Sequence, residues 1–119
     1  MEDRIPKLQF RLRVLVGAEI AIGPGKVDLL EAIGAAGSIS AAAKAMGMSY
    51  RRAWLLVDTM NRCFEMPVVT AEAGGASGGR TRLTPLGAEI VHRYRSMQAN
   101  AASAAADDLA ALAALLRLK

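Results

Sequence analysis

The feature that most constrains this chain is the stretch GSISAAAKAMGMSYRRAWLLVDTMN, which runs from Gly37 to Asn61. It joins a helix of small residues to a second helix through a single glycine turn. Ala43 leaves room where the two helices cross, and Gly47, four residues later, supplies the left-handed turn that glycine adopts at least cost. Helices joined this tightly cannot pack side by side as a hairpin. They must cross steeply, and the second helix must protrude.

The protruding helix has an apolar side and a polar side. Ser49 supplies its N-cap, and Pro67 prevents its continuation. Apolar residues recur at helical spacing and predict the side that packs on the core: Ala53, Leu56, Val57, Met60 and Phe64. The first turn then projects a different set away from the core: Ser49, Tyr50, Arg51, Arg52, Trp54 and Leu55.

The residues before this stretch predict a β-hairpin and a helix. Residues 8–16 alternate between apolar and polar side chains, which is typical of a half-buried strand. Gly17 and Ala18 predict the hairpin turn, and residues 19–22 the returning strand. Residues 26–36 predict a first helix that Gly37 ends. Ser38 or Ser40 then caps the second helix, which we expect to end at residue 46.

Two more strands and a long helix follow. Residues 68–70 and 81–84 predict short strands on either side of a glycine-rich segment, and Thr84-Pro85 is typical of a helix start. The order predicts a mostly α fold with small β (α+β), a winged helix-turn-helix with an N-terminal β-hairpin and a long C-terminal dimerisation helix. We expect the DNA-binding domain in residues 1–84 and the dimerisation helix in residues 85–119.

Composition argues against enzyme and metal chemistry. The chain has 119 residues and one cysteine, Cys63, which excludes an internal disulfide and which we expect in the core. His92 has no second histidine with which to form a zinc site. The glycines before Arg80 lead into a strand and lack the Gly-Lys-Ser/Thr of a phosphate-binding loop. No carboxylate pair or nucleophile–base set appears, so we expect no enzyme activity, no catalytic residue, no metal and no cofactor.

Positive charge accompanies the protruding helix. The formal net charge is +4, and four basic residues against one acid lie between residues 44 and 62. A protruding basic helix is typical of contact with double-stranded DNA, where the arginine fork matches O6 and N7 of guanine. We therefore predict the following DNA-binding residues: Ser38, Ser40, Lys44, Ser49, Tyr50, Arg51, Arg52, Trp54, Arg80 and Arg82.

Several of these residues have a second interpretation. Arg51 and Arg52 would also fit a solvated helix face, and Trp54 would fit either the core or the DNA backbone. Arg80 and Arg82 flank the glycine-rich turn, where an arginine can enter a minor groove or simply blunt a strand edge. The alternative function is a winged-helix protein-interaction module that does not bind DNA directly.

The final helix carries an apolar stripe too long for one small domain to cover. An exposed stripe of this length is a liability unless a partner buries it. We therefore predict a homodimer through these residues: Leu86, Ile90, Tyr94, Met97, Leu109, Leu112 and Leu116.

No targeting or membrane segment is expected. Residues 1–10 carry two acids and two bases without a continuous apolar run, unlike a signal peptide. No stretch approaches the roughly 20 apolar residues of a membrane span. The sequence thus predicts a cytoplasmic protein with no membrane partner.

Two strings resemble a known family. LLEAIGAAGSISAAAKAMGMSYRRAWLLVDTMN and LTPLGAEIVHRY are similar to the N-terminal domain of ModE-type molybdate-responsive transcriptional regulators, and more distantly to the LysR-type winged helix. The resemblance covers residues 26–95 and is specific, because SY..AW and MN are not demanded by helix-turn-helix geometry. It implies a domain that binds an operator as a dimer, usually to repress molybdate-transport genes. It also implies a reading helix over residues 49–61 and a wing over residues 74–82.

The resemblance raises a question about the effector. Full-length regulators of this type carry a C-terminal molybdate-binding module of small β-barrels, whereas the sequence here is helical in pattern up to Lys119. We therefore expect a regulator of molybdate-related genes that does not bind molybdate itself. A separate effector-sensing protein would then supply the response.

Overall fold

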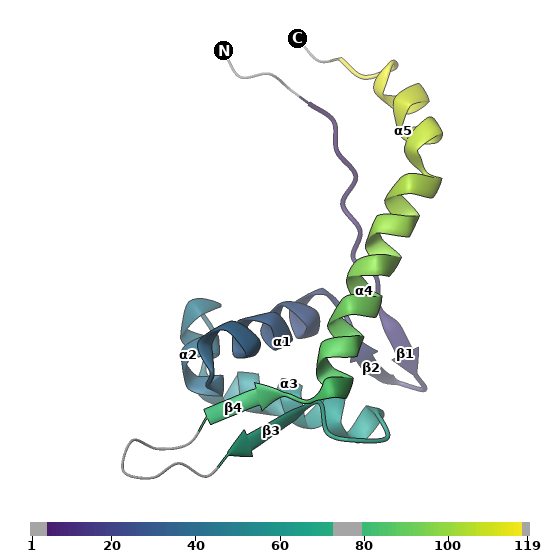
Figure 1. The fold of residues 1–119 in the computed structure, drawn as a ribbon. Coiled ribbons are helices and arrows are strands. Elements are labelled where there is room, and N and C mark those ends of the chain that lie inside the picture. The colour runs from purple at the N-terminus through teal and green to yellow at the C-terminus, as the bar shows by residue number, and fades with distance from the viewer. Residues whose placement is uncertain (1–4, 73–79, 118–119) are drawn as a thin grey trace.

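The computed structural model describes residues 5–72 and 80–117, which form five helices and two small antiparallel sheets (Figure 1). This mixed content agrees with the α+β prediction. The elements in chain order are β1 (Val14–Val16), β2 (Glu19–Ile22), α1 (Pro24–Ala36), α2 (Ile39–Ala45), α3 (Tyr50–Cys63), β3 (Val69–Glu72), β4 (Arg80–Leu83), α4 (Pro85–Ala104) and α5 (Ala106–Ala113).

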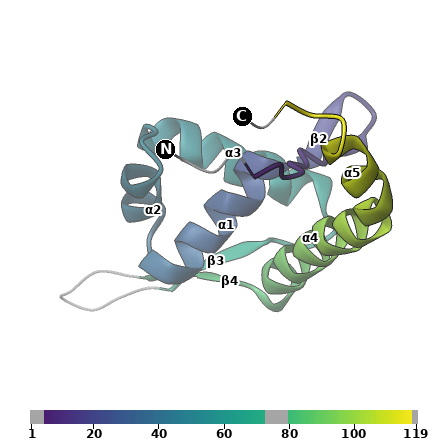
Figure 2. The same ribbon diagram turned by 90° about the horizontal axis from the view of Figure 1, so that it is seen from above.

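The helix ends follow the predicted caps. Gly37 ends α1 with φ 77°, and Gly47 separates α2 from α3 with φ 67°. The cap of α2 is Ser38 rather than Ser40, because the Ser38 hydroxyl oxygen accepts the Ala41 N–H at 2.9 Å. Ser49 caps α3 in the same way. Figure 2 shows α2 and α3 at a steep angle to one another.

One apolar core unites the helices. Ala42 and Ala43 of α2 and Ala53 of α3 are buried, so small side chains allow these helices to approach closely. Larger side chains from every helix except α5 fill the remaining space around them. The fully buried large residues are Val27, Leu29, Leu30, Ile33, Met60, Val68 and Tyr94.

A hydrogen-bonded joint connects the end of α3 with the starts of β3 and α4. The Asn61 side-chain oxygen accepts the Val68 N–H at 2.8 Å, and the Val68 carbonyl accepts the Thr84 N–H at 3.0 Å. The Thr84 hydroxyl donates to the Pro67 carbonyl at 2.7 Å and accepts the Gly87 N–H at 3.0 Å. A Cβ on Gly87 would lie 2.1 Å from the Val68 oxygen, so the joint has no space for a side chain there.

The first predicted strand is mostly wrong. Only Val14–Val16 pairs with β2, and residues 5–13 are extended without a strand partner among the described residues. The alternation persists only at the centre of this segment, where Phe10 and Leu12 are half-buried while Gln9 and Arg11 are exposed; Leu8 and Val14 at its ends are exposed. Tyr94 donates to the Leu12 carbonyl at 2.9 Å, so α4 rather than a sheet holds this segment.

The predicted single final helix is also wrong in detail. It divides at Ala105, whose φ −94° and ψ 2° leave the regular helical conformation, and α5 begins at Ala106. Asp107 and Asp108 lie in the first turn of α5, where negative charge stabilises a helix N-terminus.

The two final helices extend away from the core (Figure 1). The radius of gyration is 17.9 Å, compared with about 13.5 Å for a compact domain of this length. No helix within the described residues is long and apolar enough to cross a bilayer.

Candidate nucleic-acid interface

The outward face of α3 is a mixture of aromatic, apolar and cationic side chains. Tyr50 is 55% exposed, Trp54 47% and Leu55 44%. The core interpretation of Trp54 is therefore wrong. Ala53 and Val57, on the other side of the helix, are buried and anchor it to the core. A rigid helix thus holds large side chains in solvent, which is the arrangement expected of a binding surface.

Two arginines at the start of this helix are free of acidic partners. Arg51 and Arg52 are both exposed, and no carboxylate among the described residues lies within 4.0 Å of either guanidinium. Both residues lie in the first turn of α3, shortly after the Ser49 cap. Their charge is therefore available to an external anion.

Arg62 behaves differently. Its guanidinium pairs with Asp58 at 3.2 Å and with Glu19 at 3.3 Å, and so joins α3 to β2. Hydrogen bonds to Asp58 and Glu19 raise the pKa of Arg62. The basic concentration seen in the sequence is thus centred on the first turn of α3, and its last member serves as a structural link.

The α2 side chains divide between capping and solvent. Ser38 is half-buried and uses its oxygen as the α2 cap, and Ser49 uses its oxygen in the α3 cap, accepting the Arg52 N–H at 3.1 Å. Each hydroxyl keeps its hydrogen for another acceptor. Ser40 and Lys44 are exposed on α2. These four residues lie on the two helices that meet at Gly47.

The predicted wing is described only in part, because residues 73–79 lie outside the described residues. Arg82 pairs with Glu72 across the β3–β4 sheet at 3.1 Å, so its charge is partly neutralised. The Arg80 guanidinium lies over the α1–α2 turn, 3.0 Å from where a Cβ on Gly37 would stand. The Thr81 N–H donates to the Gly37 carbonyl at 2.9 Å and fixes β4 at this turn.

The predicted dimerisation stripe separates into two parts. Ile90 and Tyr94 are 8% and 1% exposed and belong to the core of this chain, so they do not form an exposed stripe. Leu86 and Leu109 are half-buried. The exposed members lie farther along α4 and beyond, and are Met97 (41%), Leu112 (58%) and Leu116 (47%).

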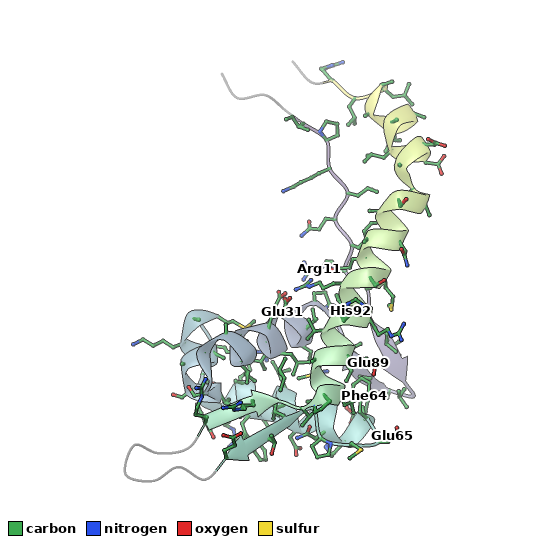
Figure 3. The ribbon with its side chains drawn as sticks, in the orientation of Figure 1. Arg11, Glu31, Phe64, Glu65, Glu89 and His92 are labelled. Carbon is green, nitrogen blue, oxygen red and sulfur yellow. The ribbon has the colours of Figure 1, made fainter. Side chains whose placement is uncertain are left out.

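The two remaining singled-out residues, His92 and Cys63, lie on different helices. His92 is exposed on α4 (Figure 3), and Cys63 is half-buried at the end of α3 rather than in the core. Within the part of the chain that the structure describes, no group of three or more histidine, cysteine, aspartate or glutamate side chains could hold a metal ion.

One ionic cluster could not be found from the sequence. Arg95 of α4 pairs with Asp28 at 2.8 Å and with Glu31, both on α1, and donates to Gln98 at 2.9 Å. The hydrogen bond that Arg95 donates to Glu31 is the main reason that the pKa of Arg95 is raised. This cluster fixes α4 against α1. Its partners are more than 60 residues apart, so no local pattern indicates the pairing.

Known relatives of this chain are named for molybdenum. It is 47% identical over 81 residues to the molybdenum-pterin-binding protein MopB of Rhodobacter capsulatus, covering 68% of this chain and 30% of that protein. It is 45% identical over 78 residues to the molybdenum transport protein ModE of Azotobacter vinelandii, covering 66% of this chain and 29% of that protein.

The name of a third relative describes it as DNA-binding. The chain is 38% identical over 71 residues to the DNA-binding transcriptional dual regulator ModE of Escherichia coli K12, covering 60% of this chain and 27% of that protein. The chain therefore spans less than a third of the length of these relatives. None of these three names describes an enzyme. No protein-family model matches the chain.

Proposed function

We propose that this chain is a sequence-specific DNA-binding module of the winged helix-turn-helix type that acts in transcription regulation. The observation that carries the proposal is the exposed first turn of α3, where Arg51 and Arg52 stand free of the described carboxylates beside exposed Tyr50 and Trp54. Exposed aromatic side chains next to unpaired cations on one turn of a helix form the kind of surface patch that marks a binding site.

The geometry of α2 and α3 supports insertion of α3 into a major groove. The 14 residues of α3 span about 21 Å, and a major groove about 12 Å wide admits one helix. Arg51 is the residue that we assign to a base edge, because its fork can contact O6 and N7 of guanine together. The capping hydroxyls of Ser38 and Ser49, together with Lys44, are placed to reach flanking phosphates.

The names of the relatives support a role in molybdenum-related gene regulation. Two of them are called ModE, and one of these is described as a DNA-binding transcriptional dual regulator. We infer that the genes controlled here serve molybdenum metabolism. The chain covers under a third of each relative, so this inference applies to the segment that they share.

We also infer that two copies act together. α5 contributes no buried residue to the core, yet it carries exposed Leu112 and is followed by exposed Leu115 and Leu116. A second copy would cover these side chains. It would also place two α3 helices on DNA, so that the preferred site would contain two related half-sites.

The deciding experiment compares Arg51→Ala with the wild-type chain on DNA sequences selected from a random pool. We expect the variant to bind the selected site about 5- to 150-fold more weakly, which corresponds to about 1–3 kcal/mol, and to lose preference at one position of each half-site. Arg93→Ala is the control, because Arg93 pairs with Glu89 on α4 at 3.3 Å and should not alter binding.

Two results would contradict the proposal. If no sequence were enriched, α3 would not read bases. If wild-type affinity for DNA hardly changed with salt, phosphate contacts would be absent, because each neutralised phosphate adds about 0.9 to the slope of log K against log salt. The exposed Tyr50, Trp54 and Leu55 would then be better explained as a protein-docking surface.

A further inference from the structure

A second group of cations lies on the flank of α3. Arg52 of α3, Lys26 of α1 and Arg11 and Arg13 of the N-terminal segment line one groove of about 290 Å³, here called the basic groove. The lining residues include no acid. Arg52 and Asn61 lie on opposite flanks of α3, because nine residues rotate a helix by about two and a half turns. The basic groove is therefore on the flank that faces away from the Asn61–Val68 joint.

The fold holds these side chains in place through neighbouring apolar contacts. Leu12 packs against the core, and its carbonyl is bound by Tyr94, so the residues on either side of it point the other way. The Arg13 stem lies beside Gly23, 3.4 Å from where a Cβ on that glycine would stand. Lys26 donates its ammonium group to the Ile20 carbonyl. Figure 3 shows Arg11 where the N-terminal segment passes α4.

The acids of the described residues do not pair with the cations of the basic groove. Across residues 5–72 and 80–117, no carboxylate lies within 4.0 Å of its four cationic groups. Asp28 lines an adjacent cavity together with Arg11, and Arg95 binds it. The first turn of α1 also faces the basic groove and contains no acid, so its helix dipole adds positive potential.

We propose that the basic groove binds the phosphodiester backbone of DNA next to the major groove that α3 occupies. This inference rests on the proposed DNA-binding function and adds a contact surface that includes the N-terminal segment. Arg52 joins the two surfaces, because it is adjacent to Arg51 in the first turn of α3 and also lines the basic groove. A duplex that contacts Arg51 therefore brings its backbone to Arg52, and the other three cations continue from there.

An extended polyanion fits this groove better than a small free anion does. Arg11, Arg13 and Arg52 are exposed rather than enclosed, so water and salt would compete strongly for a single anion there. A duplex presents several phosphates at once and is held by its other contacts. The basic groove would therefore recognise the charge of the phosphates and would not read bases.

The experiment measures binding of a labelled random-sequence duplex against salt concentration. The Arg11→Ala/Arg13→Ala variant should reduce the slope of log K against log salt by about 1.8 for each bound chain, or 0.9 for each phosphate contact. Between about 50 and 200 mM salt, the wild type should then lose about 12-fold more affinity per bound chain than the variant. Arg93→Ala/Arg117→Ala removes the same charge from α4 and from the residues after α5, away from the basic groove, and should keep the wild-type slope.

A second variant separates charge from shape. Arg11→Lys/Arg13→Lys keeps both positive charges and should keep the wild-type slope, because a phosphate accepts either cation. Thermal unfolding should show that all variants remain folded. Loss of the slope in the lysine variant would overturn the phosphate assignment, as would an unchanged slope in the alanine variant.

The remaining outcomes distinguish this inference from the proposed function. If the wild-type chain bound no duplex at any salt concentration, both would fail. If the wild-type chain bound DNA but the alanine variant kept the wild-type salt slope, the basic groove alone would be misassigned. The final measurement is calorimetry with inorganic phosphate. Micromolar binding of free phosphate that the alanine variant loses would identify a small-anion site and overturn the backbone assignment.

Discussion

Gly87 should be one of the least replaceable residues of the chain, although it lies in the first turn of a helix. In Gly87→Ala the new Cβ would stand 2.1 Å from the Val68 carbonyl oxygen and 3.1 Å from its carbon. The obstacle is backbone, so α4 and β3 would have to separate by more than 1 Å to restore ordinary contact. Separation would stretch the bond from the Thr84 N–H to the Val68 carbonyl, which is 3.0 Å long.

The size of the effect follows from three contributions. Overpacking at a site that cannot relax costs about 1–3 kcal/mol, and each lost hydrogen bond costs about 1 kcal/mol more. Alanine recovers up to about 1 kcal/mol through its higher helix propensity. The free energy of unfolding of Gly87→Ala should therefore fall by about 1–3 kcal/mol. With a sensitivity of roughly 4 °C per kcal/mol, this lowers Tm by about 4–12 °C.

Two other glycines give matched controls in urea unfolding followed by circular dichroism. Gly25 is exposed in α1 with nothing within 4 Å of its would-be Cβ, so Gly25→Ala should leave stability unchanged or raise it by up to about 1 kcal/mol. Gly47 is equally open but has φ 67°, so Gly47→Ala should cost about 1–2 kcal/mol through backbone strain alone. Equal midpoints for Gly87→Ala and Gly25→Ala would refute the steric argument.

Three further predictions concern the dimer, ionisation and the effector. Leu109→Glu/Leu112→Glu should give a monomer in sedimentation velocity, whereas Ala110→Glu/Ala111→Glu on the other side of α5 should not; a wild-type monomer would contradict the dimer. Burial raises the pKa of Tyr94 above its usual 10.0, so the associated stability is complete below about pH 10 and is lost as pH rises through the folded-state pKa. In urea unfolding, Tyr94→Phe should weaken this loss, and an equal decline in both proteins would exclude Tyr94 as its source. Calorimetry should detect no molybdate binding by the 119-residue chain beyond that of a sulfate control, and selective micromolar binding would mean that a site had been missed.

The helical part of the fold was predictable because its signals are local. Ser49, Gly37 and Thr84-Pro85 each specify a helix end through their own backbone or side chain, and the structure places the ends there. The alternation of residues 8–16 was equally clear, but it was interpreted as sheet pairing. A period of two shows only that one side of an extended segment is covered. Here α4 covers it through Tyr94, a contact 82 residues away in sequence.

The candidate interface was predictable only in its helical centre. Helical periodicity fixes which side of α3 faces outward, so the exposure of Tyr50 and Arg51 follows from the burial of Ala53 and Val57. The convergence of Arg11 and Arg13 with Arg52 requires the tertiary fold, because nearly 40 residues separate them. The pairing of cations with acids also depends on the tertiary fold. Arg52 and Arg62 belong to the same basic stretch of the sequence, but in the structure Arg62 pairs with acids and Arg52 has no acidic partner among the described residues.

This division of the arginines explains how a modest net charge can still give a strongly basic face. A formal charge of +4 is the difference between 15 basic and 11 acidic residues over the whole chain. Several acids are paired with arginines, between elements by Arg62, Arg82 and Arg95 and within α4 by Arg93.

Those ion pairs stabilise the joints only modestly, because their side chains are 39–74% exposed on the arginine side and solvent screens them. Their larger effect is to occupy carboxylates at positions other than the first turn of α3 and the basic groove. Among the described residues, the cations of that turn and of the basic groove thus have no acidic partner, and the local potential that a duplex meets there is more positive than the average charge of the chain implies.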